Sequence, residues 1–369
     1  MIKGKANIVM DGQWGSTGKG KLVGYLALTN DINAAVCDFM SNAGHTCVDD
    51  EGKSLVTCQI PMAFVNTDCM LLINPGAAIT IDRLKKELEM FADYKVADRL
   101  MIHPHVAIIT QEDRDHEKKA VERISSTLKG CGGSLSRKVM RVAKLAKHED
   151  ALAPYIGDTT KATHGILRSG GTVLLEGAQG FDLSINHGWS YPFTTSRDVT
   201  TMSILNNAGV PPFYLGDNYG ALRTYPIRVG NTYDEDGNEV GYSGDFYDDQ
   251  HEVDWEFVKA QSGAVKSQEE RTTVTNKVRR VFTFSFSQVQ RFVEICAPTK
   301  IFVNFVNHLN AEDEGKRTMS ELSHESISFV DKLQYFFNEI HTGFRSVPIP
   351  QISHLGTGAK HSDMVEIGG

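Results

Sequence analysis

Long apolar runs, an excess of basic residues and a leader-like start are all missing from this sequence. No stretch approaches the roughly 18 consecutive apolar residues of a membrane span. Residues 1–11 contain no apolar segment of the kind found in signal peptides. Lysine and arginine total 38 against 46 aspartate and glutamate residues, a formal net charge of -8 that argues against a general electrostatic grip on a nucleic-acid backbone. We therefore expect a cytoplasmic protein with no membrane or nucleic-acid partner.

Paired cysteine motifs and dividing linkers are missing as well. The 6 cysteines are scattered, with no C-x-x-C pair and no histidines at zinc-ligand spacing. The sequence therefore predicts neither a disulfide scaffold nor a zinc site, and a reducing compartment is the simplest reading. No repeat, low-complexity tract or linker rich in Pro, Gly or Ser divides the 369 residues. We predict a single domain over residues 1–369.

What the chain does contain is an alternation of short β-type runs and helical patterns. The runs expected to form strands are residues 7–10, 34–39, 70–74, 100–102, 172–175, 213–215 and 300–305. Helical patterns cover residues 81–94, 113–126 and 137–147. This alternation favours an α/β fold with a mostly parallel central sheet and helices on both faces.

The most informative segment is a glycine-rich loop at residues 11–21, which reads Asp-Gly-Gln-Trp-Gly-Ser-Thr-Gly-Lys-Gly-Lys. It lies between a β-type run and a helical pattern, where backbone N–H groups and a helix N-terminus can converge on a phosphate. It is not a Walker A loop, because Gly20 stands after Lys19 where Ser or Thr would ligate magnesium. A P-loop kinase or GTPase, or a purely structural turn, are the alternatives.

The full loop resembles the signature of adenylosuccinate synthetases, and further matches follow in the same order along the chain. They are Ser-Asn-Ala-Gly-His-Thr at 41–46, Glu-Gly-Ala-Gln-Gly at 176–180, His-Gly at 187–188, Tyr-Pro at 191–192, Val-Thr-Asn-Lys-Val-Arg-Arg at 274–280 and Gly-Thr-Gly at 356–358. The resemblance implies that family's P-loop fold, a homodimer and Mg²⁺. It also implies condensation of a 6-oxopurine nucleotide with L-aspartate, after a nucleoside triphosphate phosphorylates the purine 6-oxygen.

The resemblance also assigns roles to individual residues of this chain. It implies catalytic roles for Ser16, Lys19 and His45, and magnesium ligation by Ser16 and the Gly44 carbonyl. ATP would be bound by Gly15, Thr17, Gly18, Lys19, Gly20, Gly44, His45, Thr46, Asn307, Gly356 and Gly358. The purine monophosphate would be bound by Ser16, Asn42, Thr127, Arg141, Gln179 and Thr195, and L-aspartate by Thr273, Thr275, Lys277, Arg279 and Arg280.

Two of these assignments have open alternatives. The family segment that Arg141 resembles reaches into the neighbouring subunit, so Arg141 would act in trans. It could instead be a solvated arginine on a helix over residues 137–147. The basic residues at 277–280 would otherwise form a basic edge strand, although the interleaved threonines favour aspartate binding.

The sequence departs from the family pattern at two positions that bear on the substrates. Ser16 stands where the family has a catalytic aspartate, and its shorter side chain leaves room for a 2-amino group on the purine. Asn307 stands where the family has an aspartate that binds guanine, and an amide can match adenine. We therefore expect a guanine nucleotide as acceptor and ATP or dATP as donor.

Both departures resemble the bacteriophage branch of the family, the 2-aminoadenylosuccinate synthetases, which implies dGMP as the acceptor. An ordinary adenylosuccinate synthetase acting on IMP is the nearest rival. A nucleotide-binding pseudoenzyme or regulator is the rival of another class, because serine cannot serve as a carboxylate base. The acceptor of the purine N1 proton stays open among Asp11, water and a phosphate oxygen.

Overall fold

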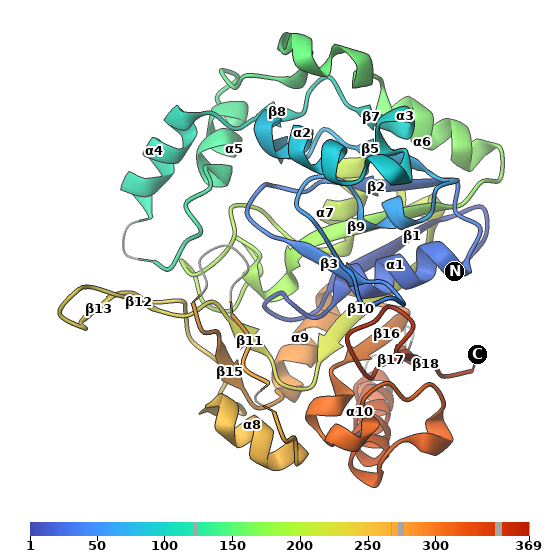
Figure 1. Ribbon diagram of the computed structural model, residues 1–369, viewed down its shortest axis with the longest axis vertical. Helices are drawn as coiled ribbons and strands as arrows, with labels where there is room; N and C mark the ends of the chain where they lie inside the picture. The colour runs from blue at the N-terminus through green and yellow to red at the C-terminus, as the bar shows by residue number, and fades with distance from the viewer. Residues whose placement is uncertain (122–123, 267, 272–276, 344–348, 369) are drawn as a thin grey trace.

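The computed structural model describes residues 1–121, 124–266, 268–271, 277–343 and 349–368, and a nine-stranded sheet forms its centre (Figure 1). The strand order is β18-β17-β16-β10-β1-β9-β2-β5-β7. Every pair is parallel except β17 with β18, which is antiparallel at one edge. The strands of this sheet are β1 (Ala6–Asp11), β2 (Ala34–Cys37), β5 (Met70–Ile73), β7 (Leu100–Ile102), β9 (Val173–Gly180), β10 (Leu215–Arg223), β16 (Lys300–Asn304), β17 (Gln351–Gly356) and β18 (Met364–Glu366).

Helices cover both faces of this sheet, as the alternation of elements predicts (Figure 1). The helices are α1 (Lys19–Thr29), α2 (Ile81–Met90), α3 (Val96–Arg99), α4 (Gln111–Ala120), α5 (Cys131–Val139), α6 (Thr159–Arg168), α7 (Thr201–Ala208), α8 (Trp255–Ser262), α9 (Phe286–Cys296) and α10 (His324–Gly343). Side chains of α1 and α2 pack into one hydrophobic cluster, and those of α6, α7, α9 and α10 pack into a second.

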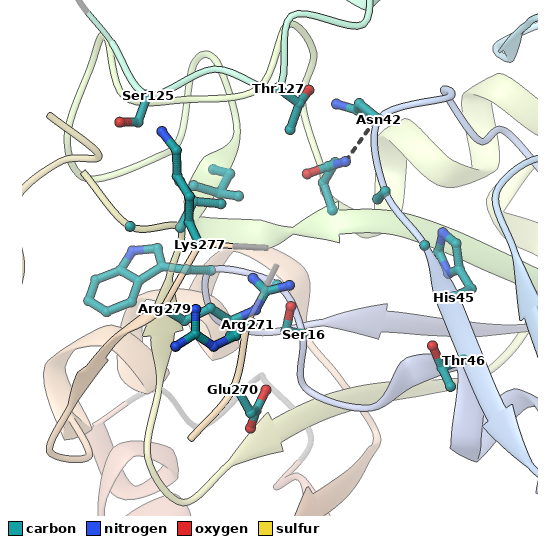
Figure 2. Close-up of a pocket in the computed structure, with 18 of the residues that line it drawn as sticks. Ser16, Asn42, His45, Thr46, Ser125, Thr127, Glu270, Arg271, Lys277 and Arg279 are labelled. Carbon is teal, nitrogen blue, oxygen red and sulfur yellow. Dashed lines mark hydrogen bonds between the residues drawn. The ribbon is translucent and has the colours of Figure 1, made fainter. Parts of the chain in front are cut away.

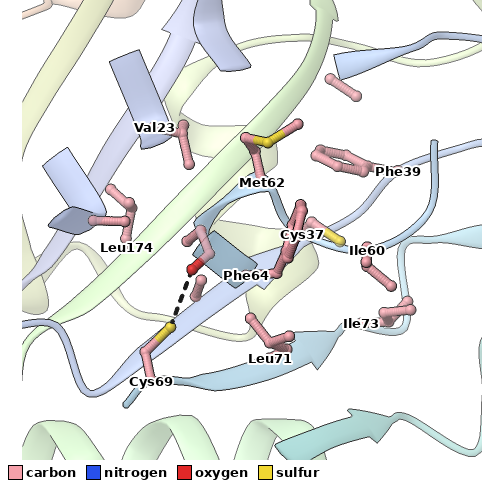
Figure 3. Close-up of a cluster of buried hydrophobic side chains, with 14 of the residues drawn as sticks. Val23, Cys37, Phe39, Ile60, Met62, Phe64, Cys69, Leu71, Ile73 and Leu174 are labelled. Atoms are coloured by element: carbon pink, nitrogen blue, oxygen red, sulfur yellow. Dashed lines mark hydrogen bonds between the residues drawn. The ribbon is translucent and has the colours of Figure 1, made fainter. Parts of the chain in front are cut away.

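The two clusters lie on opposite faces because side chains alternate along each strand. In β1, Val9 belongs to the first cluster, whereas Ile8 and Met10 belong to the second. The first cluster also contains Phe64, from a short 3-10 helix over Met62–Val65 (Figure 3). Phe64 is fully buried, and a side chain of this size stabilises the fold by about 1.5–3 kcal/mol relative to exposure.

Smaller sheets surround the central one. β3 (His45–Val48) pairs antiparallel with β4 (Ser54–Thr57), and β6 (Ala78–Ile79) pairs parallel with β8 (Ala107–Ile108). β15 (Arg280–Phe282) lies between β11 (Ile227–Arg228) and β14 (Glu252–Val253). β12 (Thr232–Tyr233) and β13 (Glu239–Gly241) form a hairpin that projects from the body of the molecule (Figure 1).

Three of the predicted elements differ from the structure. Residues 212–214 form a 3-10 helix that begins at the second of two consecutive prolines, so β10 begins only at Leu215. The pattern at 113–126 yields α4 only as far as Ala120, and Ser125 instead donates its backbone N–H to Tyr242 beside the hairpin. The predicted helix over 137–147 is wrong, because α5 ends at Val139 and Arg141 has a left-handed backbone with a φ of 67°.

Among the described residues, no helix combines the length and apolar character needed to cross a membrane.

Candidate active site

A pocket of about 370 Å³ opens where β1, β9, β10 and β16 end (Figure 2). In parallel α/β sheets, ligands bind at the carboxyl ends of the strands. Its lining brings together segments that are far apart in the sequence: Trp14, Gly15, Ser16, Gly18, Lys19, Gly20, Asn42, Ala43, Gly44, His45, Thr46, Ser125, Ser126, Thr127, Gln179, Leu183, Val229, Gly230, Thr232, Glu270, Arg271, Lys277, Arg279 and Phe305.

The phosphate loop is held in shape by the fully buried carboxylate of Asp11. One Asp11 oxygen accepts the backbone N–H groups of Gln13 (2.9 Å) and Gly15 (3.1 Å). The other accepts the Thr17 hydroxyl at 2.6 Å and its backbone N–H at 3.3 Å. Thr17 is fully buried and does not line the pocket, so the structure does not offer its side chain to ATP.

Ser16 lies on the pocket side of this loop and is exposed. Its φ of 57° is a left-handed conformation that costs a non-glycine residue free energy and that marks functional loops. The fully buried Arg223 donates to the Ser16 carbonyl at 3.0 Å and stacks on the Phe305 ring, 4.2 Å from its centroid. Arg223 also pairs with Glu270, and this positive partner lowers the pKa of that carboxyl. Arg223 thus fixes the backbone of the loop at Ser16.

Lys19 is the first residue of α1 and is 7% exposed. Its ammonium lies 3.3 Å from Asp11 Oδ2 and donates to the Gln179 carbonyl at 3.2 Å. A phosphate entering the pocket would therefore meet a cation that the fold already holds in place. The preceding Gly18 has a φ of 88°, and a Cβ there would lie 2.0 Å from Asn304 Nδ2.

His45 begins β3 and is 5% exposed. Its ring stacks on Phe39 with centroids 3.8 Å apart, and its Nδ1 lies 3.3 Å from Oε1 of the buried Glu176. The other Glu176 oxygen accepts the Met62 N–H at 2.7 Å. Buried His45 Nε2 has no hydrogen-bond partner among the described residues. An unpaired buried nitrogen on a pocket wall is placed to contact a ligand.

The residues predicted to bind the purine monophosphate divide into two groups. Asn42 and Gln179 line the pocket and are joined by a hydrogen bond of 3.0 Å, and Thr127 lines it as well (Figure 2). Gln179 has a left-handed backbone with a φ of 66°. Thr195 and Arg141 are not part of the lining that the structure describes, and Arg141 is exposed at the end of α5.

Only some of the predicted aspartate-binding residues line the pocket. Lys277 and Arg279 line the pocket, and burial lowers the pKa of Arg279. Arg280 does not: its guanidinium bonds Glu252, Ser243 Oγ and the Gly244 carbonyl. This arrangement does not support aspartate binding by Arg280. Thr273 and Thr275 lie outside the described residues.

Asn307, predicted to contact the adenine, lies in a 3-10 helix over Val306–His308, outside the pocket lining. Its amide nitrogen donates to Glu314 at 2.5 Å. Lys21 lies nearby, donating to the carbonyls of Gly358 and Asp363 at 2.7 and 2.6 Å, and burial lowers its pKa to about 8.

Gly356 and Gly358 likewise do not line the pocket among the described residues. A Cβ at Gly356 would lie 1.9 Å from Asn304 Oδ1. Packing against Asn304 therefore requires glycine at this position.

Oxygen donors suited to Mg²⁺ are present on the pocket wall. Within the described residues, no group of three His, Cys, Asp or Glu side chains could hold a metal. Mg²⁺ needs few protein ligands, because phosphates and water complete its shell. Ser16 and Gly44 both line the pocket, and the Ser16 carbonyl is already bonded by Arg223. The Ser16 hydroxyl and the Gly44 carbonyl fit a phosphate-bound Mg²⁺.

Sequence reasoning did not assign roles to three residues that organise this site, namely Asp11 as a loop anchor, Glu176 and Arg223. Asp11 and Glu176 each stand directly after a predicted apolar strand run, and a charged residue at that place is the signal that could have found them. Arg223 carries no comparable motif, since its partners Ser16 and Glu270 are distant in the sequence.

Comparison with known proteins relates this chain to the adenylosuccinate synthetases. The family model described as adenylosuccinate synthetase matches residues 8–144 and 141–319. The N6-succino-2-amino-2'-deoxyadenylate synthase of Acinetobacter phage SH-Ab 15497 is 33% identical over 351 residues, covering 87% of this chain and 89% of that protein. The enzyme of that name from Vibrio phage phiVC8 is 37% identical over 319 residues, covering 82% and 86%.

A solved structure is similar over the whole chain. It is the succinoaminodeoxyadenylate synthetase of cyanophage S-2L, bound to dGMP and to dATP as an energy donor. The TM-score is 0.79 at 27% identity, and the match covers 100% of this chain and 97% of that chain.

Proposed function

This chain belongs to the adenylosuccinate synthetase family, and we propose that it condenses dGMP with L-aspartate at the expense of ATP or dATP. The products are 2-amino-2'-deoxy-N6-succinyladenylate, the nucleoside diphosphate and phosphate. The enzyme is a ligase that forms a C–N bond. It supplies a precursor of 2-aminoadenine deoxynucleotides.

The observation that carries this proposal is Ser16. Its side chain lines the pocket from a loop that Arg223 and Asp11 hold in place. A hydroxymethyl group leaves space beside purine C2 that a carboxylate side chain would fill, and its oxygen can accept a hydrogen bond from a 2-amino group. Guanine carries that amino group and hypoxanthine does not. The relatives named for 2-amino-2'-deoxyadenylate products support the same choice.

The chemistry requires a poor leaving group to become a good one. Phosphorylation of the purine 6-oxygen achieves this, and the aspartate amine then displaces phosphate from carbon 6. Lys19 lies where it can stabilise charge on the transferred phosphoryl group. His45 can donate from Nε2, while the Phe39 ring stacks on the imidazole and the Glu176 carboxylate lies 3.3 Å from Nδ1.

We also infer which residues bind Mg²⁺ and which nucleotide is the phosphate donor. The Ser16 hydroxyl and the Gly44 carbonyl would hold Mg²⁺, which when bound neutralises charge on the phosphates. Asn307 replaces a guanine-binding aspartate with an amide, which favours adenine and hence ATP or dATP. The cyanophage structure with dATP supports this donor.

Aspartate binding and dimerisation complete the proposal. Lys277 and Arg279 line the pocket and provide cations for the two carboxylates of L-aspartate. Arg141 is exposed and not part of the described lining, which suits a residue that reaches the monophosphate of a partner subunit. We therefore propose a homodimer that acts in the cytoplasm of the cell in which it is made.

Mass spectrometry of the reaction products tests the function directly. Purified protein is incubated with ATP, Mg²⁺, L-aspartate and one of dGMP, GMP or IMP. We expect a succinyl adduct of dGMP that requires aspartate. An adduct with IMP alone would refute the choice of substrate, and nucleotide binding without any aspartate-dependent ATP hydrolysis would favour a regulator.

A further inference from the structure

We propose that Thr232 is a positioning residue that links the monophosphate-binding segment to the aspartate-binding segment, so that each ligand strengthens the binding of the other. This inference rests on the proposed function. Thr232 begins β12, at the base of the hairpin that projects from the body of the molecule (Figure 1). It lines the pocket, although it belongs to none of the sequence motifs described above.

Three segments meet at the Thr232 hydroxyl. Lys277 donates to Thr232 Oγ1 at 2.8 Å, and Ser125 Oγ lies 3.1 Å from the same atom. Ser125 Oγ in turn bonds the Gly241 carbonyl at 3.0 Å, on the opposite strand of the hairpin. In Figure 2 the Lys277 side chain extends toward Ser125. All three hydroxyl and ammonium groups belong to residues that line the pocket.

The donors and acceptors of this chain can be arranged in only one way. A carbonyl oxygen only accepts, so the Ser125 hydroxyl must donate to Gly241. The Thr232 hydroxyl then donates to Ser125 Oγ and accepts from the Lys277 ammonium, which can only donate. The hydrogen bonds therefore run from Lys277 through Thr232 and Ser125 to Gly241. Thr232 thus accepts from the segment that carries Lys277 and donates to the segment that carries Ser125.

The two ends of this chain carry different ligands under the proposed function. Ser125 lies two residues before Thr127, which lines the monophosphate side of the pocket, and its backbone N–H donates to Tyr242 at 3.0 Å. Lys277 provides a cation for the aspartate carboxylates. Because these hydrogen bonds join the two segments, a ligand that fixes the position of one also favours the bound position of the other. Such coupling is reciprocal, so dGMP and aspartate must raise each other's affinity by the same factor.

Removing the Thr232 hydroxyl should therefore remove the coupling while leaving the chemistry in place. Thr232→Val keeps the shape of the side chain and loses both hydrogen bonds. We expect the KM for aspartate to rise about tenfold, the size of one hydrogen bond to a charged group, while kcat changes less than about twofold because neither Lys19 nor His45 is touched. Thr232→Ser should restore the wild-type values.

The test measures dGMP binding by calorimetry with and without saturating aspartate, without ATP, for the wild type and its variants. We expect aspartate to tighten dGMP binding in the wild type and in Thr232→Ser, and to have little effect in Thr232→Val. Tyr233→Phe is the matched control, since it removes an exposed hydroxyl from the same strand and should retain the coupling. Ser125→Ala breaks the next bond of the chain and should lose it, which provides a second route should Thr232→Val not fold.

Two results would overturn this inference. One is a wild-type enzyme in which aspartate leaves dGMP affinity unchanged. The other is a Thr232→Val variant whose coupling and KM for aspartate match those of Tyr233→Phe. Failure of the proposed function itself would look different, because the wild type would then form no succinyl adduct of dGMP.

Discussion

In the phosphate loop, the Asp11 carboxylate accepts four hydrogen bonds from Gln13, Gly15 and Thr17 and also contacts the Lys19 ammonium. In the segment that carries His45, by contrast, buried Nε2 has no hydrogen-bond partner among the described residues. Both segments line one pocket. In the first segment, both oxygens of Asp11 hold the backbone of the loop itself, which gives a preformed phosphate site. In the second segment, an imidazole nitrogen on the pocket wall is buried and unsatisfied, which costs stability unless a ligand binds it. Substitutions should therefore separate the two, with activity lost at His45 and stability lost in the loop.

The largest effect is expected at His45. His45→Ala should lower kcat by about 10²–10⁴-fold, the usual contribution of a positioned acid. Steady-state kinetics with dGMP, ATP and aspartate measure it, and His105→Ala, an exposed histidine outside the pocket lining, is the control. A kcat within tenfold of the wild type would show that the unpaired nitrogen is not used in the reaction.

A smaller loss of kcat is expected from Glu176→Gln. The amide oxygen can still accept the Met62 N–H, but the charge facing His45 Nδ1 is gone. We expect kcat to fall about 10–100-fold, the usual size of the effect when a carboxylate that orients a functional histidine is lost, with the KM for dGMP little changed. If KM rises and kcat does not, Glu176 supports the pocket wall rather than the orientation of the histidine.

A substitution in the phosphate loop should lower stability rather than kcat. Thr17→Val removes a 2.6 Å hydrogen bond to a fully buried carboxylate and should cost about 1–3 kcal/mol of unfolding free energy. Urea unfolding measures this. Thr46→Val, at an exposed threonine of the same pocket, is the control and should change stability by less than about 0.5 kcal/mol. Equal losses in the two variants would contradict the account of the loop.

Acid should lower the free energy of unfolding by a smaller amount, through the buried His308. Burial, with Arg223 nearby, lowers the pKa of His308 to about 4, whereas an unfolded chain takes up that proton near pH 6.5. The unfolded state therefore binds more protons between pH 6.5 and pH 4, and stability falls as the pH drops through that window. We expect a loss of about 1–2 kcal/mol from His308 between pH 6.5 and pH 5. His308→Gln should reduce this slope, and an unchanged slope would contradict the assignment.

Sequence reasoning predicted the phosphate loop more easily than the contacts around His45. The glycine and lysine spacing of the phosphate loop is local, and the structure places the loop between β1 and α1 as that spacing predicts. The parallel sheet with helices on both faces also followed from the alternation of short apolar runs and helical patterns. The roles of individual residues in binding and catalysis remain predictions.

What the sequence could not predict depends on contacts between distant segments. Arg280 looked like a ligand for aspartate, yet Glu252 from a neighbouring strand pairs with it. Arg223 belongs to no recognisable motif. Its Nη1 nevertheless donates a hydrogen bond to the Ser16 carbonyl, 207 residues away in the sequence, and so fixes the backbone of the loop. The strands β17 and β18 were missed, and β17 carries serine and histidine within its run.

The most direct test of the account is the ratio of kcat/KM for dGMP to that for IMP, measured in the wild type and in Ser16→Asp. The short side chain of Ser16, which lines the pocket, should make the wild type prefer dGMP. A larger carboxylate side chain at position 16 should exclude the 2-amino group and reverse the preference, by about 10²-fold for a single group in a tight pocket. A wild type that prefers IMP, or a Ser16→Asp variant with the same ratio as the wild type, would contradict the claim that this residue selects the purine.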